Sequence, residues 1–386
     1  MERSAKQARS ARDYWLTVVS TFLFFMAISA FVLMPRQLLL LGASAPEIGW
    51  IMGSTQVTTA VFMLLVGLGM GQFSPKGLMM RGALLFAATC VGLSFVDRIG
   101  WVLYLARALQ GVGFALFFVS AGFTVVAVVP EEKRARGISL WGAGVLITQA
   151  VAPLVGEQII EHAGYATFYL AAAGCCAAAM IVARFISVIE TDEGPSTPML
   201  KLLRHRNVTM GLVALLGSAI GFGSIIAFLS AFAEREELGP VSPYFAAYTI
   251  CSLLARILGG HVADRVDRRL VIVPALLLGA GAISGLAWTQ NGLHLAIAGG
   301  AYGVASGYSY PTLMAYVVDQ VSPADRPRVI ALDNWSFTVG ILIGNLAFGP
   351  IADALSMRAA FPVAAIPAII GVGCVALGTR RARPSA

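Results

Sequence analysis

The chain has 386 residues, of which 58% are hydrophobic and 12% are charged. Charged residues make up about a quarter of an ordinary soluble domain, so the composition excludes that class of protein. The net charge of +7 would suit a nucleic-acid-binding protein, but the basic residues concentrate in alternate connections between apolar stretches, which indicates membrane topology instead.

Twelve apolar stretches of membrane-spanning length follow one another along the chain. A bilayer core about 30 Å thick requires roughly 20 apolar residues per helix. The predicted spans are residues 14–34, 46–70, 77–96, 100–128, 137–160, 165–188, 208–232, 243–263, 270–289, 293–318, 329–352 and 359–378. The charged N-terminus leads directly into the first span without a small-residue cleavage site, so we expect that span to be uncleaved.

The basic residues are distributed unequally between the two sides of the predicted bundle. Of 27 Lys and Arg, 20 lie at the N-terminus or in connections on the same side, whereas the opposite side carries Arg36, Arg98, Arg235 and Arg358. The positive-inside rule therefore predicts cytoplasmic termini and a multi-pass protein of the cytoplasmic (inner) membrane. All five cysteines fall within spans and lack metal-ligand spacing, so we expect neither disulfides nor a metal site.

The fourth span contains the segment LYLARALQGVGFA, residues 103–115, with an arginine inside an apolar run. An unpaired arginine in a bilayer costs a few kcal/mol or more, so Arg107 should face protein and have a partner. Glu157 in the fifth span is expected at a similar depth, which predicts an Arg107–Glu157 pair. The pair would serve either coupling or a purely structural clamp between these two helices.

The fifth span also contains Pro153, which removes a backbone hydrogen bond and permits bending. Residues 190–207 form the only long polar segment between spans, and we predict a cytoplasmic linker there, between six-helix bundles at 1–189 and 208–386. Shifted by 192 positions, the second half brings Gly303 onto Gly111 and Arg326 onto Arg134. Parallel repeats of six helices are typical of secondary transporters.

The second half supplies most of the remaining candidate site residues. Arg256, in the eighth span, can bind a carboxylate through its guanidinium fork or extend to the cytoplasm. Tyr302 and Asn345 are expected to line a substrate cavity. Gly299, Gly303 and Gly307 are spaced four apart, which favours close helix packing.

A charged loop, GGHVADRVDRR at residues 259–269, connects the eighth and ninth spans. A carboxylate there can rest against a helix N-terminus while arginines bind carbonyl groups or acids of the other half. The loop is thus either a latch for one conformation or a solvated positive-inside connection. The corresponding loop of the first half has Gly71 and Gln72 where this loop has its acid and its arginine. We expect Asp333, early in the eleventh span, to supply charge to the first turn of its own helix instead.

These motifs together resemble the major facilitator superfamily over essentially the whole chain. Residues 259–269 match the superfamily's loop pattern, 103–115 resemble its fourth-helix pattern, and 151–158 resemble its fifth-helix Gly-Pro motif, with Ala152 where glycine is usual. The resemblance implies two pseudo-symmetric bundles and antiport. It also implies proton coupling through Arg107 and Gln110 and gating through Gly260, Asp264, Arg265, Arg268, Arg269 and Pro153. To these we add Glu157 as a coupling residue, from its expected depth beside Arg107, and Asp333 as a gating residue.

We predict a transporter and not an enzyme, because the sequence contains no phosphate-binding loop, nucleophile elbow or metalloprotease helix. The preferred function is proton-coupled efflux of a small organic solute by alternating access. One alternative is uptake or exchange of a small carboxylate using Arg256, and a remote one is a non-transporting membrane sensor. We expect a monomer in the lipid bilayer, with protons and a small molecule as partners and no cofactor.

Overall fold

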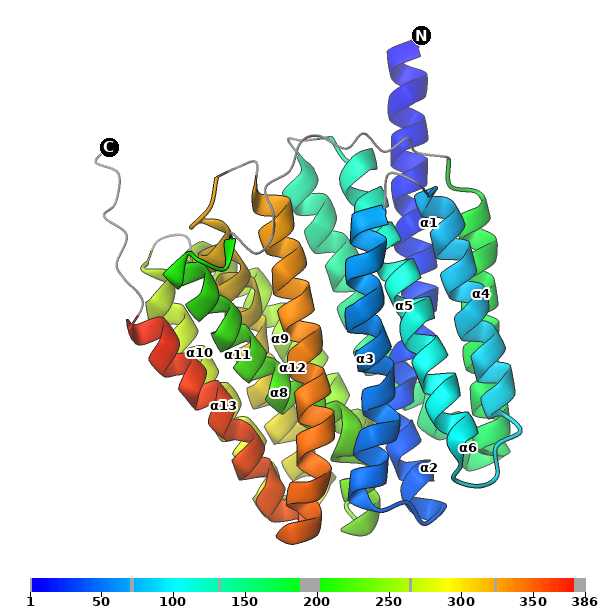
Figure 1. Ribbon diagram of the computed structural model, residues 1–386, viewed down its shortest axis with the longest axis vertical. Coiled ribbons are helices and arrows are strands. Elements are labelled where there is room, and N and C mark those ends of the chain that lie inside the picture. The colour runs from blue at the N-terminus through cyan, green and yellow to red at the C-terminus, as the bar shows by residue number, and fades with distance from the viewer. Residues whose placement is uncertain are drawn as a thin grey trace.

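The computed structural model describes residues 2–69, 73–130, 133–187, 202–263, 266–322 and 325–377, with backbone alone for 2–9, 68–69, 135, 259–263 and 327. The described part of the chain is helical and contains no strand (Figure 1). Its elements are α1 (Glu2–Ala30), η1 (Phe31–Leu33), α2 (Met34–Leu40), α3 (Ala45–Gly69), α4 (Pro75–Leu93), α5 (Trp101–Val128), α6 (Arg134–Arg184), α8 (Arg206–Arg235), α9 (Ser242–Ala263), α10 (Arg268–Gly285), η3 (Leu286–Trp288), α11 (Gly292–Val318), α12 (Arg326–Ala354) and α13 (Met357–Leu377).

Helix α6 is a hairpin of two helical arms that meet at Gly164. The Tyr14 hydroxyl donates to the Gly137 carbonyl (2.9 Å), and the Ser20 hydroxyl donates to the Ala179 carbonyl (2.8 Å). Tyr14 and Ser20 are about 9 Å apart along α1, whereas Gly137 and Ala179 would be about 63 Å apart along one straight helix. The chain therefore folds back at Gly164, whose φ of 76° lies in the region that favours glycine.

The described residues contain nine helical stretches that are long and apolar enough to cross a membrane. One of these is the α6 hairpin, which contributes two spans, and α9 and α11 are of membrane length as well. Twelve helical segments of membrane length result. The prediction of an all-α membrane protein is confirmed, and its first span comprises α1, η1 and α2 together.

The helices form two groups that pack against each other. In the first, α1 packs on α6, and α5 packs on α3 and α4; in the second, α8 packs on α12 and α13, and α9 packs on α11. The groups meet where α3 contacts α12, α6 contacts α9, and α2 contacts α8. The predicted domain boundaries remain a prediction, since most of the predicted linker, residues 190–201, lies outside the described residues.

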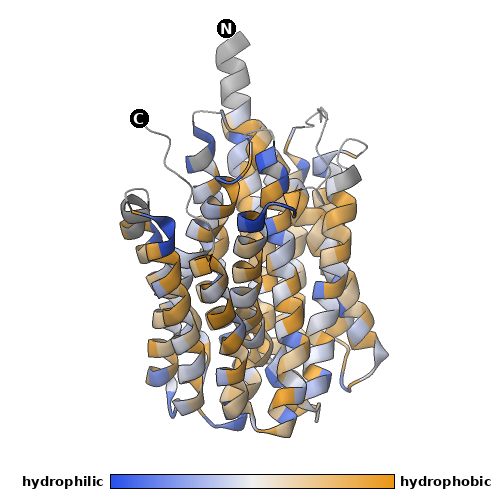
Figure 2. Ribbon diagram, turned by 60° about the vertical axis from the view of Figure 1, so that its left-hand side comes forward, coloured by the Kyte–Doolittle hydropathy of each residue, from blue (hydrophilic) through white to orange (hydrophobic). Residues whose placement is uncertain are grey.

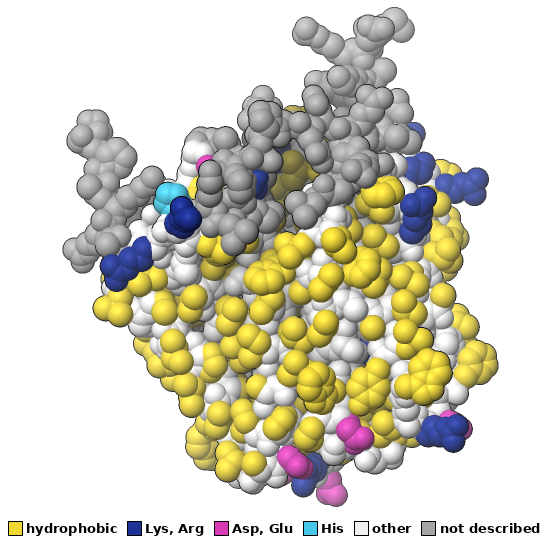
Figure 3. Space-filling model, in the orientation of Figure 1, with side chains coloured by type: hydrophobic (Ala, Val, Ile, Leu, Met, Phe, Trp, Pro, Cys, Tyr) yellow, Lys and Arg dark blue, Asp and Glu magenta, His cyan; other side chains and the backbone are white. Residues whose placement is uncertain are grey.

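The outer surface has the character of a membrane protein. Hydrophobic residues cover its long sides, and hydrophilic residues concentrate at the two ends (Figures 2 and 3). Trp101 and Trp288 are 73% and 70% exposed at one end, as expected for rings at the membrane interface. We call the end at which α1 begins and α13 ends the terminal face, and the other end the opposite face.

Close packing of α11 on α9 depends on three glycines. A Cβ atom at Gly307 would lie 2.7 Å from the Ser252 carbonyl oxygen, and one at Gly299 or Gly303 would collide with a backbone carbonyl of α9. The prediction that this spacing brings two helices together is confirmed.

Replacing Gly303 by leucine is expected to destabilise the protein by at least about 3 kcal/mol, because the side chain must displace the backbone of α9. Thermal unfolding of the detergent-purified protein measures the effect. Gly281→Leu on α10 is the matched control, since a Cβ atom there meets nothing within 4 Å. Equal melting temperatures for the two variants would show that α9 and α11 are not in contact as described.

Candidate functional site

Two polar contacts join the halves near the opposite face, and we call them the opposite-face latch. The Glu157 carboxylate accepts hydrogen bonds from the backbone N–H groups of Val241 (2.6 Å) and Ser242 (3.2 Å). Arg36 on α2 pairs with Glu234 on α8 at 2.6 Å. Helix α9 begins at Ser242, and the first N–H groups of a helix lack intrahelical acceptors and carry positive partial charge. Glu157 therefore caps a helix of the other half.

The interface between α3 and α12 is closed at the same end. A Cβ atom at Gly349 would lie 2.5 Å from the Ala45 carbonyl oxygen, and one at Gly53 would lie 2.8 Å from a methyl group of Leu346. Nearer the middle, Thr249 on α9 donates to the Leu146 carbonyl on α6 (3.3 Å). Between described residues, the latch contacts that join the halves thus lie near the opposite face, and two further hydrogen bonds, from Thr249 to the Leu146 carbonyl and from Thr338 Oγ1 to Met63 Sδ (3.7 Å), join the halves nearer the middle.

The predicted pair between Arg107 and Glu157 is wrong. Arg107 is 5% exposed, which confirms that it faces protein, but its Nη1 donates to Gln110 Oε1 at 2.7 Å. Its guanidinium lies over the Phe31 ring, 5.1 Å from the centroid. Similar depth in adjacent spans does not fix helix rotation: this side of α5 faces α4 and η1, whereas Glu157 on the first arm of α6 faces α9.

Arg107 belongs to a buried polar cluster inside the first half. Gln110, which accepts from it, donates in turn to Cys90 Sγ at 3.7 Å. Among the described residues, no carboxylate lies within 4.0 Å of the Arg107 guanidinium, and its Nε has no hydrogen-bond partner. A charge-assisted hydrogen bond and a cation–π contact stabilise the charge in place of an ion pair.

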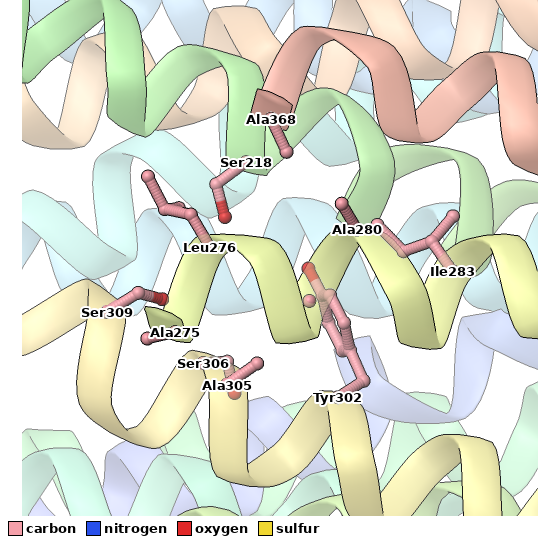
Figure 4. A pocket seen from close by; sticks show the side chains of 11 residues that line it. Ser218, Ala275, Leu276, Ala280, Ile283, Tyr302, Ala305, Ser306, Ser309 and Ala368 are labelled. Carbon is pink, nitrogen blue, oxygen red and sulfur yellow. The ribbon is translucent and has the colours of Figure 1, made fainter. Parts of the chain in front are cut away.

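Tyr302, predicted to bind substrate, lies inside the second half. Its ring stacks on those of Phe222 and Tyr248, with centroids 6.1 and 5.9 Å away. It borders a cavity of about 10 Å³ between α8, α10, α11 and α13, which Ser218, Ser306 and Ser309 also line (Figure 4). That volume suits about one water molecule, so this cavity does not hold an organic solute. The substrate role of Tyr302 remains a prediction.

The other two predicted substrate residues have different surroundings. Asn345 is 1% exposed, and with its amide nitrogen turned toward carbonyl groups it donates to Gly223 (2.9 Å) and Ile341 (3.1 Å). It thereby ties α12 to α8. Arg256 on α9 is half-buried, and its Nε has no hydrogen-bond partner. Arg256 therefore retains a donor for a ligand, whereas the amide of Asn345 is already engaged.

The charged loop at residues 259–269 makes its described contacts within the second half. Arg268 pairs with Asp319 at 2.8 Å, and the Arg269 guanidinium lies 6.0 Å from the Tyr316 ring centroid. Gly260 lies near the end of α9, whereas Asp264 and Arg265 lie outside the described residues. Pro153 lies within the first arm of α6, which stays helical up to Gly164. The gating roles of these residues remain predictions.

Asp333 does not supply charge to the first turn of its helix, so that prediction is wrong. Helix α12 begins at Arg326, and its first turn contains no acidic residue. Asp333 lies two turns into the helix with 0% exposure, and neither carboxylate oxygen has a hydrogen-bond partner. The helix starts earlier than predicted because Arg326 and Pro327 form its first turn, and proline is favoured there.

Comparison with known proteins identifies the family. The model of the Major Facilitator Superfamily matches residues 15–245 and 241–386. The multi-drug resistance efflux pump PmrA of Streptococcus pneumoniae is 26% identical over 324 residues, 79% of each chain. The staphylopine export protein of Staphylococcus aureus is 20% identical over 82% of this chain and 83% of its own.

Solved structures share the fold at low sequence identity. The nucleoside transporter NupG superposes with a TM-score of 0.77 at 13% identity, covering 94% of this chain and 98% of its own. A bacterial homologue of the human lysosomal transporter Spinster, solved in an inward-facing, unoccupied conformation, gives a TM-score of 0.76 at 14% identity over 95% and 96% of the two chains. The fold, the twelve membrane-length segments and the family match lead to one conclusion: the chain belongs to the Major Facilitator Superfamily and is a membrane transporter.

Proposed function

We propose that the protein exports a small organic solute across the cytoplasmic membrane in exchange for protons. The observation that carries this proposal is the closure of the opposite face, where Glu157 caps α9 of the other half and Arg36 pairs with Glu234. A carrier closed at one face can open there when its halves tilt, which is alternating access between repeats. Relatives named as an efflux pump and an export protein support export as the direction.

The positive-inside distribution supports cytoplasmic placement of the terminal face. The opposite-face latch then closes the outer side, and a solute would enter from the cytoplasm. Glu157 contributes to this cycle as part of the latch, whereas Arg107 and Gln110 contribute through the buried cluster of the first half. We propose a monomer, since a transport path between the two halves of one chain needs no second copy.

Reconstituted vesicles test the proposal. The purified protein is placed in liposomes containing the pH dye pyranine, and neutral, anionic and cationic organic compounds are added singly. Solute–proton exchange predicts a dye signal for at least one compound, and an imposed pH gradient drives accumulation of that compound. Solute movement that ignores the gradient would contradict proton coupling, and absence of movement for every compound would favour a non-transporting sensor.

A second candidate function is uptake or exchange of a small carboxylate. The unpartnered Nε of Arg256 favours it, because a guanidinium binds carboxylates through two parallel hydrogen bonds. Carboxylates would raise the melting temperature of the purified protein, and Arg256→Ala would remove that shift while the exposed Arg204→Ala retains it. Stabilisation by non-acidic compounds alone would rule this candidate out.

A further inference from the structure

Asp333 differs from the other buried acids of the described chain. Asp13 is 3% exposed and pairs with Arg12 at 3.1 Å, and Glu157 is 9% exposed and accepts two backbone hydrogen bonds. Asp333 has 0% exposure and no hydrogen-bond partner on either carboxylate oxygen. Of the buried acids that the structure describes, it alone has no group to balance an ionised carboxylate.

The surroundings of Asp333 contain few groups that could compensate its charge. One turn further along α12, Ser336 donates to the Leu212 carbonyl of α8 (2.9 Å), and the Phe337 ring lies 5.3 Å from that of Tyr310 on α11. Tyr310 interacts electrostatically with both Asp333 and Arg256 of α9, but Arg256 forms no ion pair with Asp333 within 4.0 Å. The other titratable side chains of the helices packed on α12 are His294, Tyr302, Tyr308 and Tyr316 on α11, Arg358 and Cys374 on α13, Arg206, Glu234 and Arg235 at the ends of α8, and Glu47 at the start of α3.

The position of Asp333 connects its charge to the interface between the halves. An ionised carboxylate that loses its hydration without gaining a donor is strongly disfavoured, whereas the neutral acid avoids that loss. The same helix, α12, contacts α3 across the interface, where Thr338 donates to Met63 Sδ at 3.7 Å. A conformation in which Asp333 regains water or a cation therefore requires α12 to move relative to α8 and α11, and such movement can change the contact of α12 with α3.

We propose that Asp333 is the proton-carrying group of this transporter. The inference rests on the proposed proton-driven function and assigns its coupling to a residue of the second half. A proton binds the carboxylate while the opposite face is open, and the neutral acid favours the conformation described here, with that face closed. The proton leaves to water at the terminal face as α12 moves during the return of the halves, so one proton crosses per cycle.

Distances between spin labels in lipid nanodiscs test the proposal without a substrate. With the five native cysteines replaced, labels at Arg98 and Arg235 report on the opposite face, and labels at Arg136 and Arg326 report on the terminal face; all four residues are exposed. In the wild type, raising the pH should lengthen the first distance and shorten the second, because ionisation disfavours the closed opposite face. Asp333→Asn should hold the low-pH distances at every pH, and Asp333→Glu should restore the response with a changed midpoint.

The controls separate failure of this inference from failure of the proposed function. Asp97→Asn, at an exposed carboxylate, should leave the response unchanged. Glu157→Gln, which removes the charge of the latch carboxylate, should keep the Asp333 response. A pH response that persists in Asp333→Asn would overturn the assignment to Asp333 alone, and no pH response in the wild type would contradict proton coupling itself. If Asp333→Asn does not fold, the infrared C=O stretch of the protonated carboxyl group decides instead. The band should keep its wild-type frequency in Asp97→Asn and shift in Asp333→Glu, and an unchanged band in Asp333→Glu would overturn the proposal.

Discussion

Replacing Glu157 by alanine is expected to open the opposite face. The substitution destabilises only the conformation with the halves closed, because only there does the Glu157 carboxylate accept from the N–H groups of Val241 and Ser242. A hydrogen bond to a charged group contributes about 1.5–3 kcal/mol, which corresponds to a shift of roughly 10- to 150-fold toward the open conformation. The distance between labels at Arg98 and Arg235 measures the shift, and solute export should slow because the carrier returns to the terminal-face-open conformation less often.

The matched control is Glu161→Ala, which removes an exposed carboxylate one turn further along the same helix. It should leave the label distances unchanged. Glu157→Gln should give an intermediate shift, because its amide oxygen still accepts from α9 but carries no charge. Identical distance distributions in Glu157→Ala and the wild type would show that the cap does not hold the two halves together.

Replacing Arg107 by methionine distinguishes coupling from a structural clamp. Methionine removes a buried charge that has no ionic partner but leaves Gln110 Oε1 without its donor; these two effects oppose each other, so the melting temperature should change little. Proton-driven export should fall at least about tenfold if the arginine acts in coupling. The purified variant is measured by thermal unfolding and by the vesicle assay, with the exposed Arg81→Met on α4 as control.

The opposite result would identify a clamp. In that case Arg107→Met would lower the melting temperature while the protein that remains folded exports at the wild-type rate. Arg107→Lys adds a further comparison, since lysine keeps the charge but lacks the planar fork that lies over Phe31 and reaches Gln110.

The sequence predicted the fold well because membrane spans depend on local composition. Apolar length identified the helices, and the spacing of Gly299, Gly303 and Gly307 identified the close approach of α11 to α9. The burial of Arg107 followed from the cost of its charge in lipid. Each of these properties depends on one segment and the solvent around it.

The partners of the polar residues could not be predicted in the same way. Depth along a span gave the height of Arg107 and Glu157 but not the rotation of their helices, and the rotation turns Arg107 toward Phe31 of η1 and Glu157 toward α9. The isolation of Asp333 depends on what α8, α11 and α12 place around it, which no local pattern specifies. Asn345 was expected at a cavity, but its amide can equally bond backbone carbonyls of packed helices, as it does here.

A reversible cross-link across the latch tests alternating access most directly. Arg36→Cys and Glu234→Cys, whose native side chains pair at 2.6 Å, are joined by a short disulfide-forming linker in the background without native cysteines. Flux is then followed for the solute that gives the largest pyranine signal. The account predicts that the cross-link stops transport, that reduction restores it, and that either single variant transports under the same treatment. Transport at the uncross-linked rate with the link intact would contradict it.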